Sequence, residues 1–210
     1  MRRICLAVAL SLWLTPSAAL ADDICTYTDW AWHSAEGRAE DFNTVNTRRS
    51  ELSPEQRHPD LPCSICREDQ VEITLSTGDS VTVCHVIAPA VDAALERAVA
   101  SGFPIESLTG YRVGRTRGPL DARGFRTLYS HHSFGLAIDV NAETNGLYDR
   151  CVTWGPSCRL RRGGAWRLGN RSSIRPDGPA YRAMRDIGLK WGGELEGRQK
   201  DFMHFSLAGN

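Results

Sequence analysis

The segment SHHSFGLAIDV, residues 130–140, places an aspartate, Asp139, inside an otherwise apolar stretch. A carboxylate buried alone among apolar side chains costs several kcal/mol, so a fold that buries this segment must place a cation, a hydrogen-bond donor or a metal ion beside it. Two adjacent histidines, His131 and His132, lie near the start of the same segment. We therefore predict a buried β-strand whose aspartate belongs to a polar site.

A second apolar segment, DFMHFSL over residues 201–207, is also predicted to form a strand and would bury His204. With His132 and Asp139 it makes two imidazoles and one carboxylate, a common ligand set for zinc that leaves a fourth position for water. Asp201 stands three residues before His204 and reaches the same water if the chain bends between them. The pattern predicts metal-assisted hydrolysis of an amide bond.

Small residues on the first strand fit this prediction. By the two-residue alternation of a strand, Gly135, Ala137 and Asp139 share one face. We expect the imidazole of His132 to fold back over Gly135, where the missing side chain leaves room for a metal ion.

Two sequence signatures resemble those of the M15 zinc peptidases. The first, SxHxxGxAxD, matches residues 130–139, and the second, DxxHF, matches residues 201–205. The segment GLKWGGE, residues 188–194, is similar to the family's G-x-x-W-G-G segment, and the resemblance covers about residues 87–207. The family includes D-alanyl-D-alanine carboxypeptidases, vancomycin-resistance D,D-dipeptidases and L-alanyl-D-glutamate endopeptidases of phage lysins.

The resemblance implies a role for each residue of the site. It implies that His132, Asp139 and His204 bind Zn²⁺ and that Asp201 is the general base. His131 is an alternative ligand, but the register of the signature assigns that role to His132. His131 is then expected at the surface or in the substrate groove.

The family also carries an arginine in a GYR segment upstream, which stabilises the oxyanion and the substrate carbonyl. Arg112 matches it. The loop that follows departs from the family pattern, so Arg115 and Arg117 remain alternatives. Ser130 and Trp191 are predicted, with His131, to contact substrate, although Trp191 also fits an ordinary core position.

Cysteines indicate disulfides in an exported chain. After residue 21 six cysteines remain, an even number typical of an oxidising compartment. Only Cys151 with Cys158 is paired by spacing alone. The CxxC of Cys63 and Cys66 is interpreted as structural rather than redox-active, and we expect it to staple the base of the following hairpin.

Residues 1–21 have the pattern of a secretory signal peptide, with two arginines, an apolar core and an A-x-A cleavage site. No later stretch is long enough for a membrane span. Without this segment the 25 basic and 25 acidic residues become 23 and 25. This near-neutral balance argues against a nucleic-acid partner held through phosphates.

Helices and short strands are mixed without regular alternation, which predicts the α+β class. The resemblance implies a small antiparallel sheet with packed helices, like Hedgehog and D,D-peptidase domains. We divide the chain into a disulfide-stapled N-terminal extension, residues 22–86, and a zinc peptidase domain, residues 87–210. The other predicted elements are a helix near residues 35–47, a hairpin over 71–86, a helix over 88–102, a strand over 108–113 and a helix over 179–188.

The expected function is a secreted, periplasmic zinc peptidase that cuts a peptide bond in peptidoglycan stem peptides or cross-links. The alternative is a non-catalytic zinc module that binds cell wall or a protein, as Hedgehog domains do with the same fold. A lysin or toxin directed at other cells would share the chemistry. The bond that is cut, L-Ala-D-Glu, D-Ala-D-Ala or a cross-link, stays open, as does the role of the extension as a stabilising segment or a lid.

Overall fold

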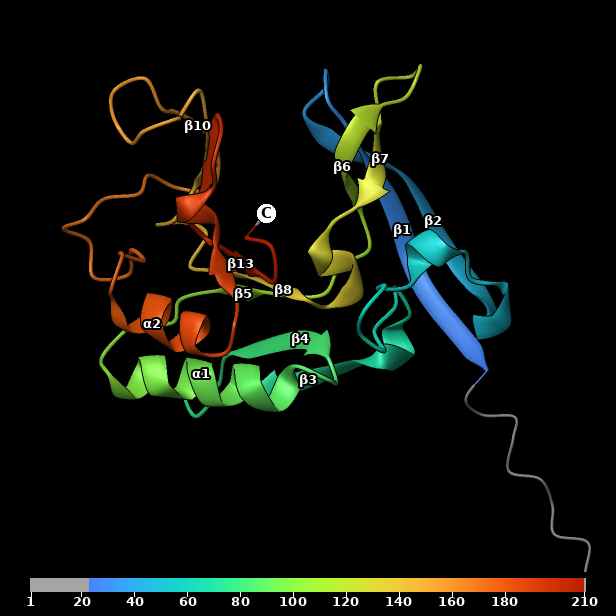
Figure 1. Cartoon of the computed structure of the whole chain (residues 1–210), viewed down its shortest axis with the longest axis horizontal. Coiled ribbons are helices and arrows are strands. Elements are labelled where there is room, and N and C mark those ends of the chain that lie inside the picture. The colour runs from blue at the N-terminus through green and yellow to red at the C-terminus, as the bar shows by residue number, and fades with distance from the viewer. Residues whose placement is uncertain (1–22, 210) are drawn as a thin grey trace, which may run out of the picture.

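The computed structural model describes residues 23–209 and has the predicted α+β class, with helices α1 (Ala88–Ala100) and α2 (Pro179–Asp186) beside small sheets (Figure 1). The predicted signal peptide lies outside the described residues. No helix in residues 23–209 is long and apolar enough to cross a membrane. The strands are β1 (Ile24–His33), β2 (Arg38–Arg48), β3 (Gln70–Thr74), β4 (Ser80–Cys84), β5 (Leu108–Thr109), β6 (Arg115–Leu120), β7 (Arg126–Tyr129), β8 (Ala137–Val140), β9 (Leu147–Asp149), β10 (Arg159–Arg162), β11 (Lys190–Trp191), β12 (Gln199–Asp201) and β13 (His204–Ser206).

The central sheet has the order β11-β13-β8-β5, with antiparallel pairing throughout. All four residues of β8 are buried, because the core covers both faces of this strand. Ile138 and Val140 of β8 share one hydrophobic cluster with Val91 and Leu95 of α1. Both helices start at a proline-containing first turn, and their predicted positions are confirmed.

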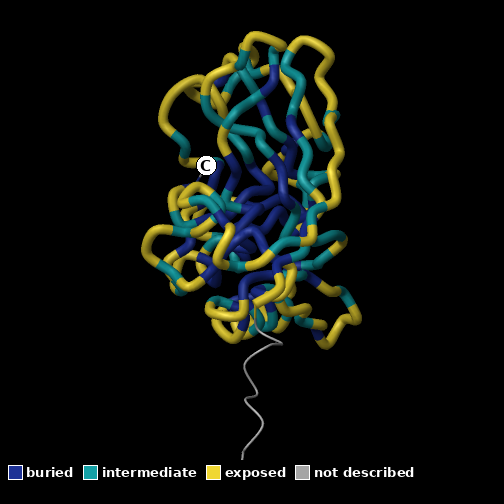
Figure 2. The backbone as a smooth tube through the Cα atoms, turned by 90° about the vertical axis from the view of Figure 1, so that its right-hand side faces the viewer, coloured by how far each residue is buried: buried dark blue, intermediate teal, exposed yellow. Residues whose placement is uncertain are grey.

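Two further sheets flank the central one. In Figure 1 strand β10, of the sheet β10-β9-β12, stands to the left of β8 and β13, and β6 and β7, of the sheet β2-β1-β6-β7, stand to the right. Helices α1 and α2 lie below them. Figure 2 shows that the buried backbone gathers in the middle of the molecule. The central sheet therefore lies between the other two sheets in this view.

The helix predicted near residues 35–47 is wrong, because this segment forms β2 and pairs with β1 in a long hairpin. Its Thr and Val residues favour a strand, and its Asn residues are poor helix formers. Thr28 and Thr44 face each other across the pair with their hydroxyl oxygens 3.2 Å apart. Pairing with β1 therefore determines the structure of this segment, and not its weak helical pattern.

The hairpin predicted over residues 71–86 is confirmed as β3 and β4. Val81 and Val83 of β4 pack in the same cluster as α1, across the predicted boundary between residues 86 and 87. This boundary stays a prediction.

Three disulfides are present among residues 23–209: Cys25–Cys66, Cys63–Cys84 and Cys151–Cys158. The predicted Cys151–Cys158 pair is therefore confirmed. The CxxC is structural, because each of its cysteines bonds elsewhere, and Cys63 staples the end of β4 as expected. Such disulfides fit an oxidising compartment.

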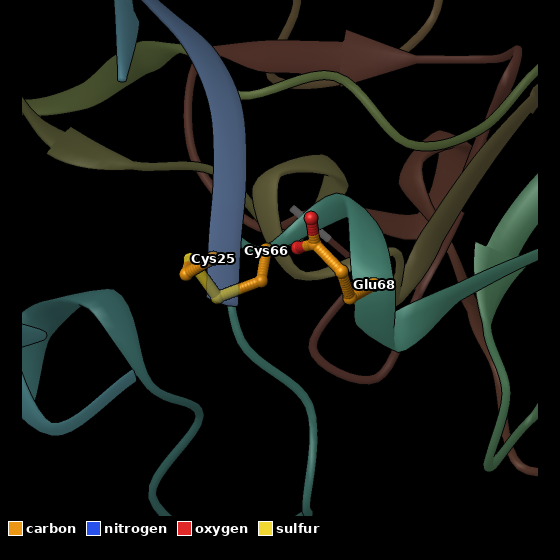
Figure 3. A group of neighbouring side chains, drawn as sticks. All are labelled: Cys25, Cys66 and Glu68. Atoms are coloured by element: carbon orange, nitrogen blue, oxygen red, sulfur yellow. A yellow bond between two sulfur atoms is a disulfide. The ribbon is translucent and has the colours of Figure 1, made fainter. Parts of the chain in front are cut away.

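Glu68 lies beside the Cys25–Cys66 disulfide (Figure 3). Its carboxylate accepts hydrogen bonds from the backbone and hydroxyl of Thr26, at 2.9 and 2.6 Å. Because both sulfur atoms are covalently bonded to each other, this group is a structural staple and not a metal site.

Gly135 has a different role from the predicted one. It ends the 3₁₀-helix His131–Phe134 with φ +66°, and so stands before β8 rather than on its face. Its carbonyl accepts a hydrogen bond of 2.9 Å from the backbone of Cys84. A Cβ here would overlap that backbone nitrogen and the side-chain oxygen of Gln70. Glycine therefore serves the turn and the close approach of the hairpin, not a space for metal.

We predict that Gly135→Ala lowers the free energy of unfolding by about 3 kcal/mol, as the sum of a left-handed backbone and an overpacked contact. Gly78→Ala is the matched control, because Gly78 has φ +90° but a Cβ added there would meet nothing within 4 Å. It should cost only about 1 kcal/mol. Urea denaturation of both variants measures the difference, and equal losses would contradict the packing role.

Candidate metal centre

The three predicted ligands meet at one point of the central sheet. Asp139 of β8 pairs directly with His204 of β13, and the 3₁₀-helix before β8 adds His132. The Oδ1 atom of Asp139 lies 2.9 Å from Nδ1 of His204 and 3.1 Å from Nε2 of His132. The two nitrogens are 3.2 Å apart. All three side chains are buried, so three ligand atoms converge inside the protein.

The polar atoms of His132 and Asp139 that point away from the centre are hydrogen-bonded to other residues of the chain. Nδ1 of His132 lies 2.7 Å from the carbonyl of Gly110, which accepts its proton and leaves the lone pair of Nε2 facing the centre. Arg112 donates a hydrogen bond of 2.9 Å to Oδ2 of Asp139, which leaves Oδ1 for the centre. The carbonyl of Gly110, which orients His132, was not anticipated from the sequence.

The residues fit a metal ion. A buried atom in this region, Oδ1 of Asp201, has no hydrogen-bond partner within residues 23–209, and Asp201 interacts electrostatically with His204 and Asp139. Buried polar atoms normally have one, so a group beyond the chain's own is expected at this place. Two imidazole nitrogens and a carboxylate oxygen are donors that suit Zn²⁺.

The surroundings of the three ligands set their protonation states. Burial lowers the pKa of His132 and keeps its imidazole neutral. Burial alone would raise the pKa of Asp139, but the charges and hydrogen bonds of His132 and His204 hold it well below its usual value. Burial also disfavours the charged form of His204, but the hydrogen bond to Asp139 raises its pKa overall. Metal binding needs the deprotonated ligands, and it would displace the proton that this pair shares.

Asp201 ends β12, and the chain then turns at Phe202 and Met203 before β13. The single strand predicted over residues 201–207 is therefore two strands, and the bend predicted between Asp201 and His204 is confirmed. Burial raises the pKa of Asp201 to about 6, with His204 and Asp139 among its electrostatic neighbours. A carboxyl group with this pKa can accept and release a proton near neutral pH.

Aromatic packing holds this turn. The ring of Phe202 stacks on Trp166 at 4.1 Å, and its carbonyl accepts a 2.8 Å hydrogen bond from Nε1 of Trp191. Trp191 is only 2% exposed and packs edge-on against Tyr181 at 5.7 Å. Its burial supports the core interpretation of Trp191, in which the side chain supports the turn, and a contact of Trp191 with substrate stays a prediction.

The GYR segment brings Arg112 to the centre. The strand predicted over residues 108–113 ends at Thr109, and the backbone N–H of Arg112 donates to the carbonyl of His132 at 3.1 Å. Its guanidinium contacts Asp139 and lies 3.2 Å from Nδ1 of His132, with a quarter of the side chain exposed. This places a cation beside the ligands that is still open to solvent.

The alternative arginines lie elsewhere. Arg115 donates to Asp29 and to the hydroxyl of Tyr129, each at 2.6 Å, and its guanidinium stacks on the Tyr129 ring. Arg117 is half-buried on β6, and burial lowers its pKa. Neither has a described contact with the ligands.

Ser130 and His131 precede the ligand His132. Ser130 is buried, and its carbonyl accepts a hydrogen bond of 2.9 Å from Ser133 at the start of the 3₁₀-helix. Among the described residues His132, and not His131, belongs to the converging group. Contacts of Ser130 and His131 with substrate stay predictions.

Residues 123–207 match the family model described as D-alanyl-D-alanine carboxypeptidase, of the M15 peptidases. This range contains His132, Asp139, Asp201 and His204, whereas Arg112 lies before it. No curated protein and no solved structure matches the chain.

We predict that His132→Ala and His204→Ala each lower the zinc affinity more than ~100-fold, because removal of a ligand costs at least as much as removal of a group that orients one. His131→Ala is the neighbouring control and should keep its zinc. Metal content after dialysis, measured by atomic emission beside a circular dichroism check of folding, tests this. Zinc lost from His131→Ala and kept in His132→Ala would reverse the assignment.

Proposed function

We propose that this chain is a zinc-dependent peptidase that hydrolyses a peptide bond in peptidoglycan stem peptides or cross-links, because residues 123–207 match a family model of the M15 peptidases. One observation carries the proposal. The ligand atoms of His132, Asp139 and His204 converge in a buried site, and the buried carboxyl group of Asp201 interacts electrostatically with His204 and Asp139.

The proposed chemistry divides the work among these residues. A bound zinc ion supplies a Lewis acid that polarises the scissile carbonyl and lowers the pKa of water towards ~7. Asp201 accepts the proton of the attacking water and returns it to the leaving amine. Arg112, whose guanidinium is partly exposed beside Asp139, donates hydrogen bonds to the developing oxyanion.

Catalysis is favoured over a non-catalytic binding module by Asp201. A buried carboxyl oxygen without a hydrogen bond costs about 1–3 kcal/mol, which a purely structural role does not explain. Its raised pKa and its place beside the ligands suit a base. A module that only binds its partner has no use for such a group.

Export is part of the proposal. The three disulfides support an oxidising compartment, and residues 1–21 have the pattern of a signal peptide. We place the protein in the periplasm, where peptidoglycan peptides are its substrate. The balanced formal charge of the chain supports no nucleic-acid partner.

We expect the purified protein to release new fragments from peptidoglycan, and a strong chelator to abolish this release until zinc is added back. Mass spectrometry of muropeptides before and after digestion measures it and identifies the bond, because each bond leaves a different fragment mass. Cleavage that persists with the chelator present would refute zinc dependence.

We expect Asp201→Asn to keep its zinc and to lose about 10²–10⁴-fold in kcat, the usual contribution of a general base. In the wild type kcat/KM should fall at acidic pH, because Asp201 is then protonated. The midpoint should lie between the ordinary carboxyl range and about 6, since burial raises the pKa of Asp201 to about 6 and the charge of a bound cation lowers it again.

The variant should lack this acidic limb in its pH–rate profile. Asp186→Asn, at an exposed aspartate on α2, is the control and should behave as wild type. An Asp201→Asn protein with wild-type turnover would remove Asp201 from the mechanism.

A further inference from the structure

One cross-strand row of the β10-β9-β12 sheet contains Asp201. Leu147 of β9 pairs with Asp201 on one side and with Arg162 of β10 on the other. The register of β10 shifts between Leu160 and Arg162, and Arg162 is paired with Leu147 after this irregularity. Directly paired residues project from the same face of a sheet, so Arg162 and Asp201 share a face two strands apart, about 10 Å between α-carbons. An extended arginine side chain spans much of that distance, and Arg162 is among the positive charges that lower the pKa of Asp201, after His204 and Arg112.

The other arginines of β10 are neutralised. Arg159 donates to both oxygens of Asp149, at 3.0 and 2.7 Å, and Arg161 lies 3.5 Å from the same carboxylate. Arg162 is exposed and has no hydrogen bond or ion pair from its side chain among residues 23–209. The one arginine of this strand that lies in the cross-strand row of Asp201 is thus the one without an acidic partner.

The edge position of β10 leaves Arg162 open to a ligand. β10 has a neighbouring strand on one side only, and all four of its residues are exposed. Arg112 is already bound to Asp139, so Arg162 is an uncompensated guanidinium near the proposed base. A guanidinium without a partner suits a carboxylate, which it can bind through two parallel hydrogen bonds.

We propose that Arg162 binds a carboxylate of the substrate next to the scissile bond and so selects peptides that are negatively charged there. This inference rests on the proposed peptidase function. The carboxylate is either the free C-terminus of the peptide or the carboxyl group of an acidic residue beside the bond. Arg162 is a specificity residue, since it acts on the substrate charge and not on the proton transfer.

Two matched pairs of peptides separate these sources. One pair ends in D-Ala-D-Ala with a free or an amidated C-terminus, and the other contains L-Ala-D-Glu or L-Ala-D-Gln. For the carboxylate member that the enzyme cleaves, Arg162→Gln should raise KM about 10- to 100-fold, the value of a charged hydrogen bond, with kcat within about two-fold. The uncharged member should show no change in KM.

Two variants control for charge and for folding. Arg162→Lys should recover part of the loss, because it keeps the charge without the planar fork. Arg161→Gln, one residue away on the same exposed strand, should leave KM as in wild type. An equal rise in KM for the charged and uncharged peptides, or none for either, would overturn the role of Arg162.

Binding without turnover separates this inference from the proposed function. Calorimetric titration of the zinc-loaded Asp201→Asn protein, with and without Arg162→Gln, should show the same loss of affinity for the carboxylate peptide alone. If wild-type protein cleaves none of the peptides or peptidoglycan, the proposed function fails. If it cleaves them but binding is independent of Arg162, the inference alone fails.

Discussion

The ionised Asp139, on a strand buried along its whole length, is the constraint on which the rest of the structure depends. Its two oxygens are assigned to different partners: Arg112 binds Oδ2, while His132 and His204 surround Oδ1. These partners come from three separate segments, and each must be placed to within a hydrogen-bond length. Leaving such a charge unpaired would cost several kcal/mol. The buried carboxylate is therefore stable only in a fold that brings these three segments together.

The N-terminal extension contributes to this placement. Tyr111, next to Arg112, donates from its hydroxyl to the carbonyl of Ile65 at 2.6 Å and from its backbone to Thr82 at 2.7 Å. The disulfides Cys25–Cys66 and Cys63–Cys84 anchor the same region. These contacts support a stabilising role for residues 22–86, in which the extension fixes the segment that carries the arginine.

The site also contains groups that stability alone does not explain. Asp201 has a buried oxygen without a partner, and Arg162 lies in its cross-strand row without an acid of its own among residues 23–209. The other two arginines of β10, Arg159 and Arg161, are neutralised by Asp149. Polar and charged groups without partners near a set of converging ligands are typical of a functional site. In such a site a bound ligand or substrate supplies the missing partners.

Local pattern was enough to predict much of this protein from its sequence. The α+β class, both helices, the β3-β4 hairpin and the Cys151–Cys158 pair follow from spacing within a few turns of chain. The meeting of His132, Asp139 and His204 was also predicted, because polar residues buried on apolar strands must find one another.

Only the tertiary structure decided what depends on partners far away in the chain. Residues 38–48 form a strand because they pair with β1. Gly135 is required because the β3-β4 hairpin packs closely against it. The tertiary structure also buried Trp191 under Phe202 and set Arg162 in line with Asp201 across an intervening strand. No local pattern encodes these contacts, because each depends on which surface the fold brings against the residue.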